Sequence, residues 1–190
     1  GIMGRMGKAI LSTPGGCEIG LRPVDLHLSS IEQLGAKITT ENGFIVCSSS
    51  EKSLRGTRII LSFPSVGATE NIILAATLAK GTTIISNAAR EPEITDLADF
   101  LNKCGAKIYG AGDSTITIEG VSHLTPCEHT IIPDRIVVAT YMIATAMTGG
   151  KISIKDIIPS HIGPIIQPLR DAGCIISING RNVVASSEKH

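Results

Sequence analysis

Leu34-Gly35-Ala36-Lys37-Ile38 recurs later in the chain as Cys104-Gly105-Ala106-Lys107-Ile108, and in a weaker form as Ala172-Gly173-Cys174-Ile175-Ile176. The second residues of these segments, all glycines, lie 70 and 68 positions apart. Another glycine, Gly81, returns as Gly150 after 69 positions. Self-similarity at a nearly fixed spacing is typical of proteins built from repeated structural units. The sequence therefore predicts copies of one unit of this length.

The order of elements within a unit is clearest in the middle of the chain. Gly81 can adopt the left-handed conformation that ends a helix, so an apolar helix is expected before it. A β-branched strand follows, and Pro92 then begins an amphipathic helix. The expected elements are a helix, a strand, a helix and two hairpin strands, at 66–80, 82–86, 92–104, 106–109 and 115–119.

The other two copies carry Asn-Gly pairs, Asn42-Gly43 and Asn179-Gly180, between short apolar segments. Asn-Gly is the favoured centre of a type I′ turn, so both pairs predict hairpins. The hairpin strands are expected at 37–40, 44–48, 175–178 and 182–185. The unit is therefore βαβαββ-like, with parallel strands that need helical crossovers and an apolar helix that must be buried. The predicted fold class is α/β (α+β).

Composition excludes several classes of partner. Lys plus Arg equals Asp plus Glu at 17 each, which gives no basic surface for nucleic acid or a membrane. Trp is absent and aromatic residues make up 3% of the chain, so base stacking is not expected either. The most apolar run, 136–148, is too short to span a bilayer and is expected to form a buried helix. Gly1-Ile2-Met3 has no signal-peptide pattern, which favours a cytoplasmic location.

The cysteines and histidines do not predict a metal site. The five cysteines, Cys17, Cys47, Cys104, Cys127 and Cys174, are an odd number without a C-x-x-C pair. A disulfide framework and a structural zinc site are therefore not expected. The last four of these cysteines are expected to be small buried residues. No metal and no cofactor is predicted.

Cys17 lies in a different context, the segment 12–27, S-T-P-G-G-C-E-I-G-L-R-P-V-D-L-H. Glycines flank the cysteine and predict a loop, and Pro23 suits the first position of the helix that follows. Arg22 would then lie at a helix N-terminus, where an anion is favoured. A thiol near an arginine and a helix start is a candidate for a lowered pKa, although Glu18 opposes this. The alternative is a free cysteine without a role.

This segment resembles the active-site loop of the enolpyruvyl transferases that act on UDP-N-acetylglucosamine in bacterial peptidoglycan synthesis. Further matching strings follow in the same order, at 64–69 (P-S-V-G-A-T), 87–93 (N-A-A-R-E-P-E) and 133–136 (P-D-R-I). The resemblance implies two lobes, each an inside-out barrel of three repeated units with buried helices and outer sheets. Residues 1–132 resemble the later two units of the first lobe, and 133–190 the first unit of the second.

The resemblance implies a transferase that joins the enolpyruvyl group of phosphoenolpyruvate to the 3-hydroxyl of UDP-N-acetylglucosamine. It makes Cys17 the catalytic residue, linked to protonation, to a covalent adduct and to the antibiotic fosfomycin. The implied substrate contacts are Arg22, Pro23, Val24, Asp25, Leu26, Ser65, Val66 and Gly67. The family's N-terminal lysine-asparagine pair and second-lobe aspartate have no counterpart here. The chain is therefore expected to be an incomplete, inactive portion, whose partner is the remainder of the enzyme or a second copy.

Several features depart from the family pattern or stay open. Pro164 and Pro168 fall in a helix expected over 160–172, where an interior proline costs about 3 kcal/mol. The segment 87–93 is interpreted as structural, and Asp134-Arg135 as an ion pair at the lobe junction.

The alternative functions are a non-catalytic repeat domain that binds an anionic ligand or partner, the shikimate-pathway enolpyruvyl transferase, and the RNA 3′-phosphate cyclase.

Overall fold

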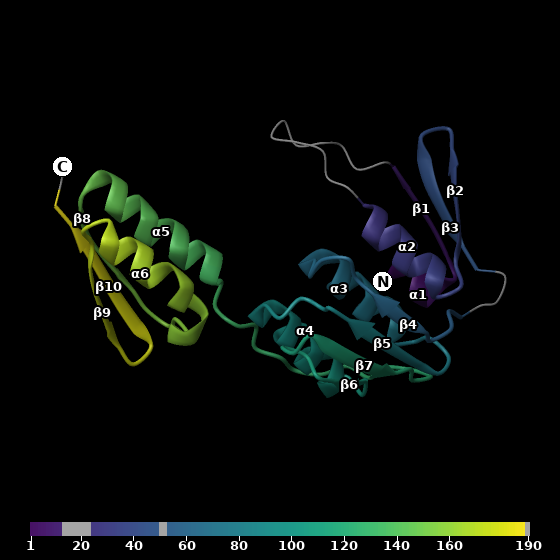
Figure 1. Cartoon of the computed structure of the whole chain (residues 1–190). Coiled ribbons are helices and arrows are strands. Elements are labelled where there is room, and N and C mark those ends of the chain that lie inside the picture. Colours follow the sequence, from purple (N-terminus) through teal and green to yellow (C-terminus); the bar gives the residue numbers. More distant parts are fainter. Residues whose placement is uncertain (13–23, 50–52, 189–190) are drawn as a thin grey trace. The chain divides into compact units, whose positions relative to one another are not determined.

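The computed structural model of the protein describes residues 1–12, 24–49 and 53–188. The chain divides into two compact units, unit 1 (Gly1–His129) and unit 2 (Thr130–His190) (Figure 1). Each unit has its own cluster of buried apolar side chains, so each is described by itself. The expected division at 1–132 and 133–190, with its assignment to two lobes, stays a prediction.

Unit 1 alternates helices with short strands. Its elements are α1 (Ile2–Met6), β1 (Lys8–Ser12), α2 (Asp25–Gln33), β2 (Lys37–Glu41), β3 (Phe44–Ser48), β4 (Arg58–Ile60), α3 (Val66–Ala76), β5 (Thr82–Ser86), α4 (Pro92–Lys103), β6 (Lys107–Tyr109) and β7 (Thr115–Glu119). The strands form an antiparallel sheet in the order β1-β3-β2 and a second sheet in the order β4-β5-β7-β6. In the second sheet β4 and β5 are parallel and the other pairs are antiparallel.

α3 is the central helix of unit 1. Its residues Ala68, Ile72 and Ile73 have no exposed surface, and α1, α2 and α4 all contact it. The helix ends at Ala76 rather than at the predicted Lys80. The chain is already extended at Lys80, because its backbone N–H donates to Leu54 O at 2.8 Å. The expectation of a buried apolar helix in this unit is confirmed.

The predicted hairpins form, but only one turn has the predicted centre. Asn42 and Gly43 both have positive φ, 51° and 78°, as a type I′ turn requires. In unit 2, Asn179 instead pairs with Asn182 in the strand ladder, so the loop consists of Gly180 and Arg181. Gly180 has φ 56° at the first central position, which suits a type II′ turn. The prediction that Asn179-Gly180 forms the centre was therefore wrong by one residue.

Unit 2 packs two helices against one sheet. Its elements are α5 (Arg135–Thr148), β8 (Gly150–Ile154), the short 3-10 helix η1 (Pro159–Ile162), α6 (Gly163–Asp171), β9 (Ile175–Asn179) and β10 (Asn182–Ser187). The antiparallel sheet has the order β8-β10-β9. The helix expected over 160–172 is thus divided into η1 and α6. Pro164 lies in the first turn of α6, where no hydrogen bond is lost, and Pro168 is tolerated inside it.

The expectation that 136–148 forms a buried helix was wrong for this unit. α5 buries Val138, Met142 and Thr145, which lie on one face. Its exposed large apolar side chains are Ile136, Val137, Tyr141, Ile143 and Met147. A helix against a single three-stranded sheet buries only one stripe of its surface, so the high apolar content of α5 exceeds what unit 2 can cover.

Candidate functional site

The structure describes some of the predicted site residues and not others. Cys17, Arg22 and Pro23 lie outside the described residues. Those inside are Val24, Asp25, Leu26, Ser65, Val66 and Gly67. They fall at two places, the start of α2 and the start of α3, and these two places make up the candidate site.

The start of α2 is held by apolar contacts. The helix begins at Asp25 rather than at the predicted Pro23, and Val24 is its N-cap residue. Val24 and Leu26 pack against the core of unit 1, which fixes the direction of the first turn. No described side chain caps this helix start. The amide groups of the first turn therefore keep the donor capacity that an anionic ligand can use.

The start of α3 is capped by its own sequence. Ser65 is the N-cap residue, and its Oγ accepts a hydrogen bond from the Ala68 N–H at 3.3 Å. The Thr69 hydroxyl donates to Ser65 O at 2.8 Å and accepts from the Ala89 N–H at 3.1 Å. Thr69 thus ties the first turn of α3 to the loop that follows β5.

The first turns of α2 and α3 lie against each other. The amide nitrogen of Asn71 donates to His27 Nδ1 at 2.8 Å and to Gly67 O at 3.1 Å. An amide nitrogen has no acceptor capacity, so we assign His27 the tautomer with its proton on Nε2. A Cβ added at Gly67 would lie 3.2 Å from His27 Cε1, which explains why a glycine suits this position.

This contact brings two helix N-termini to the same end of unit 1. Each N-terminus carries a partial positive charge, and two together favour an anion more than one does. Asp25 in the first turn of α2 opposes this effect. Burial raises the pKa of Glu70 on α3, and the charge of Glu93 raises it further. Glu70 is therefore harder to ionise than a fully exposed glutamate.

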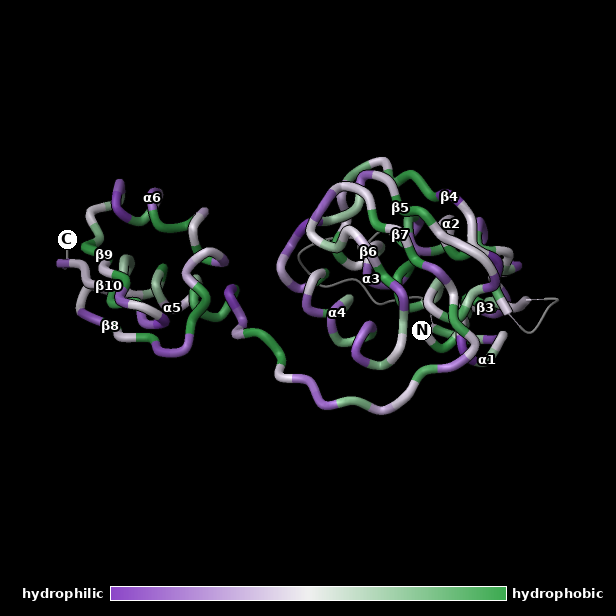
Figure 2. Tube along the Cα trace, turned by 90° about the horizontal axis from the view of Figure 1, so that it is seen from below, coloured by the Kyte–Doolittle hydropathy of each residue, from purple (hydrophilic) through white to green (hydrophobic). Residues whose placement is uncertain are grey.

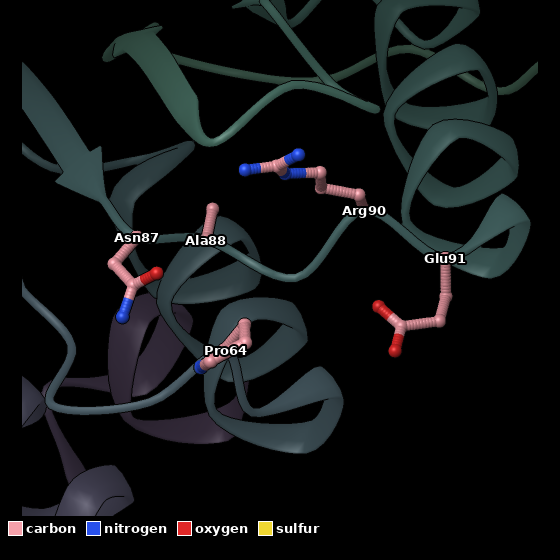
Figure 3. A pocket seen from close by; sticks show the side chains of 5 residues that line it. All are labelled: Pro64, Asn87, Ala88, Arg90 and Glu91. Atoms are coloured by element: carbon pink, nitrogen blue, oxygen red, sulfur yellow. The ribbon is translucent and has the colours of Figure 1, made fainter.

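A pocket of about 390 Å³ opens beside the start of α3. It is lined by Pro64, Asn87, Ala88, Arg90 and Glu91 (Figure 3). Asn87 has φ 58° and donates through its amide to Leu61 O at 2.9 Å, which turns the loop back onto β4. Figure 3 shows the Arg90 side chain extending over Ala88, while the Glu91 carboxylate points the other way.

The interpretation of 87–93 as purely structural therefore missed a contribution to a pocket. The loop is structural in part, because its backbone is held by Thr69 and by Ser114 O, which accepts from the Ala88 N–H at 3.0 Å. It also places Arg90 near the first turn of α3. The sequence signal that could have indicated a role for Arg90 in binding was an arginine directly before a helix start. The same pattern identified Arg22 as a candidate.

A second cavity, of about 620 Å³, borders the start of α2. Its lining includes Val24, His27 and Asn71 together with apolar side chains of α1, β1 and β3. Within the described ranges, no group of three or more His, Cys, Asp or Glu side chains is placed to hold a metal ion. None of the described helices is long and apolar enough to cross a membrane.

Comparisons with known proteins identify the family of the chain. The sequence profile of EPSP synthase (3-phosphoshikimate 1-carboxyvinyltransferase) matches residues 1–190. The chain belongs to the EPSP synthase family. It is 52% identical over 184 residues to UDP-N-acetylglucosamine 1-carboxyvinyltransferase 1 of Symbiobacterium thermophilum, covering 97% of this chain and 42% of that protein. It is 53% identical over 176 residues to the protein of the same name from Caldanaerobacter subterraneus subsp. tengcongensis, covering 93% and 42%.

Solved structures of related fold were also found. The enolpyruvyl transferase NikO from Streptomyces tendae matches with a TM-score of 0.79 at 23% identity, over 98% of this chain and 45% of that one. EPSP synthase from Acinetobacter baumannii matches with a TM-score of 0.63 at 19% identity, over 96% and 43%. The predicted enolpyruvyl transferase fold and the predicted relationship are confirmed. The chain spans less than half the length of each of these relatives.

Proposed function

We propose that this chain forms part of an enzyme that transfers the enolpyruvyl group of phosphoenolpyruvate to the 3-hydroxyl of UDP-N-acetylglucosamine, in the cytoplasm. The observation that carries the proposal is the identity of 52% and 53% to two proteins named UDP-N-acetylglucosamine 1-carboxyvinyltransferase 1. The paired starts of α2 and α3 support it, because a nucleotide sugar presents a diphosphate and phosphoenolpyruvate presents a phosphate and a carboxylate.

We assign the diphosphate of the nucleotide sugar to the paired helix starts. Val66 and Gly67 offer backbone amides at the start of α3, and Ser65 can offer its hydroxyl, because its own N–H already donates to Phe63 O at 2.9 Å. The segment from Arg22 to Leu26 offers a guanidinium and the start of α2. Arginine matches a phosphate with two parallel hydrogen bonds, which a lysine cannot do. Arg90 extends the cationic region into the neighbouring pocket.

We assign the proton transfer to Cys17. In the addition step the sugar 3-oxygen bonds to C2 of phosphoenolpyruvate while the methylene carbon takes a proton, which a thiol can donate. In the elimination step the methyl carbon loses a proton and the C2–O bond to phosphate breaks, which releases inorganic phosphate and the enol ether. As a thiolate, the same cysteine can add to C2 or to the epoxide of fosfomycin.

We propose further that the other catalytic groups lie in the remainder of the enzyme or in a second copy. The apolar side chains that α5 exposes support a partner of this kind, since unit 2 does not cover them. In the same scheme, 1–132 belongs to one lobe and 133–190 to the other. The purified chain is accordingly expected to show no turnover by itself.

Two measurements on the purified chain test the proposal. Fosfomycin should add to Cys17 with one equivalent per chain, seen by intact mass and by peptide mapping, and Cys17→Ser should abolish it. Cys127→Ser is the matched control and should leave labelling intact. Calorimetry should show that UDP-N-acetylglucosamine binds. Absence of both labelling and nucleotide-sugar binding would overturn the proposal, and binding without labelling would favour the non-catalytic repeat domain.

A further inference from the structure

The last part of unit 1 is an irregular strap, residues 120–129, that runs along α4. It follows β7 and has neither helix nor strand, and Figure 2 shows both hydrophilic and hydrophobic residues in the chain after β7. Thr125 contacts the C-terminal end of α4, because its N–H and its hydroxyl both donate to Cys104 O, at 2.8 and 3.1 Å. His129 contacts the N-terminal half, with Nε2 at 2.9 Å from Asp96 Oδ1. The strap is therefore antiparallel to the helix.

Between these two contacts the strap brings two thiols together. Cys127 Sγ lies 3.1 Å from Cys104 Sγ, and 3.7 Å from Phe100 O. A disulfide bond has an S–S distance of about 2.05 Å, so an approach of about 1 Å would join the two atoms. Both cysteines are free thiols in this structure. The prediction that Cys127 is buried was wrong, since it is partly exposed.

The surroundings of the pair do not suit a metal. His129 lies two positions after Cys127, but its Nε2 bonds to Asp96 and its Nδ1 lies 3.2 Å from Lys103 Nζ. No group of three or more metal-ligand side chains occurs here or elsewhere in the described part of the chain. Two adjacent thiols without further ligands have oxidation to a disulfide as their characteristic chemistry.

We propose that Cys104 and Cys127 are an oxidisable pair that hydrogen peroxide converts into an intrachain disulfide. The thiolate of Cys127 attacks the peroxide, an S–O bond forms, the O–O bond breaks, and hydroxide leaves and takes up a proton as water. Cys104 then attacks the sulfenic sulfur of Cys127. The S–S bond forms, the S–O bond breaks, and a second water leaves with the proton of Cys104. Two thiols lose two electrons, which reduce one peroxide to two waters.

Exposure decides which cysteine reacts first. Cys127 is partly exposed and can meet a peroxide from solution, whereas Cys104 is buried beneath the strap. The hydrogen bond with Cys127 raises the pKa of Cys104, and burial raises it further. Cys104 therefore keeps its proton until the sulfenic acid has formed, and it acts as the resolving thiol. The product fastens the strap to the end of α4.

The test is a thiol map of the whole chain. Reduced protein is treated with hydrogen peroxide, blocked with an alkylating reagent, unfolded and digested with trypsin. Cleavage after Lys103, Lys107 and Arg135 places the two cysteines on separate peptides, 104–107 and 108–135. We expect these peptides as one cross-linked species that has lost two hydrogen atoms and that dithiothreitol separates. Amide exchange at 125–129 should slow at the same time.

Variants distinguish the pair from general oxidation. Cys127→Ser should leave Cys104 as a free thiol after peroxide, and Cys104→Ser should leave Cys127 as a sulfenic or sulfinic acid. Cys174→Ser, in unit 2, is the control and should not change the cross-link. The proposal is overturned if wild-type Cys104 and Cys127 both stay alkylatable, if Cys127 passes to sulfinic acid while Cys104 stays a thiol, or if the cross-link forms only in urea. None of these results depends on the proposed transferase activity.

Discussion

Asn71→Ala tests the contact that brings the two helix starts together. The substitution removes the hydrogen bonds from the Asn71 amide to His27 Nδ1 and to Gly67 O. A hydrogen bond of this kind contributes about 0.5–1.5 kcal/mol, so the free energy of unfolding of unit 1 should fall by about 1–3 kcal/mol. If about 1 kcal/mol of this free energy serves to position the start of α2, the Kd for the proposed ligand, UDP-N-acetylglucosamine, should rise about fivefold.

Asn102→Ala is a matched control within the same unit. Its amide also makes two hydrogen bonds, both to the backbone of Ile108 and both of 2.8 Å. This control should lose a similar free energy of unfolding, measured by urea denaturation, without weakening ligand binding. Hydrogen exchange should report faster exchange at the start of α2 in Asn71→Ala alone. Equal effects of the two variants on Kd, with α2 exchange unchanged, would refute a positioning role for Asn71.

Three other substitutions test separate features. Glu70→Gln should raise the urea midpoint at about pH 7 and lose this advantage at about pH 4, because burial raises the pKa of Glu70 in the folded protein. The protonated glutamate contributes its full stability below the unfolded-state pKa of about 4.3. This contribution is lost as the pH rises through the raised pKa of the folded state. Gly120→Ala would place a Cβ against Ala79 O, closer than van der Waals contact allows, and should lower the free energy of unfolding by about 3 kcal/mol or more. Gly163→Ala is the control and should leave the free energy of unfolding nearly unchanged, because open space surrounds Gly163. Met142→Ala, at 0% exposure in unit 2, should cost about 2–5 kcal/mol, seen as lost exchange protection in β8–β10 but not in unit 1.

The secondary structure could largely be predicted because its signals are local. β5 has the predicted bounds, Thr82–Ser86, since β-branched residues and the preceding glycine define it without help from the rest of the chain. α4 likewise ends within one residue of its prediction. The errors arose where a distant contact decided the outcome. Lys80 leaves the helical path because its N–H bonds to Leu54, which no local pattern records.

The candidate site could be predicted only as separate segments. Ser65 as a helix cap follows from its own neighbours, but the contact of His27 with Asn71 joins residues 44 positions apart. The approach of Cys104 to Cys127 spans 23 positions. Repeats and turn residues specify the elements, whereas side-chain packing between elements decides which of them meet. For this reason the loop with Arg90 was interpreted as structural, although it borders a pocket.

The start of α3 is positioned by burial of the helix and by a side-chain hydrogen bond. α3 has 0% exposure at Ile72 and Ile73, and Thr69 ties its first turn to the loop after β5, so its amides are positioned before a ligand arrives. Helix termini that are fixed in this way need no reorganisation when they bind an anion, and this favours affinity. The proposed reactive thiol lies in a segment rich in glycine, eight positions before Asp25. A thiol that serves as acid in one step and nucleophile in another needs more than one position, and the glycines around Cys17 in the sequence are compatible with this requirement of the proposal.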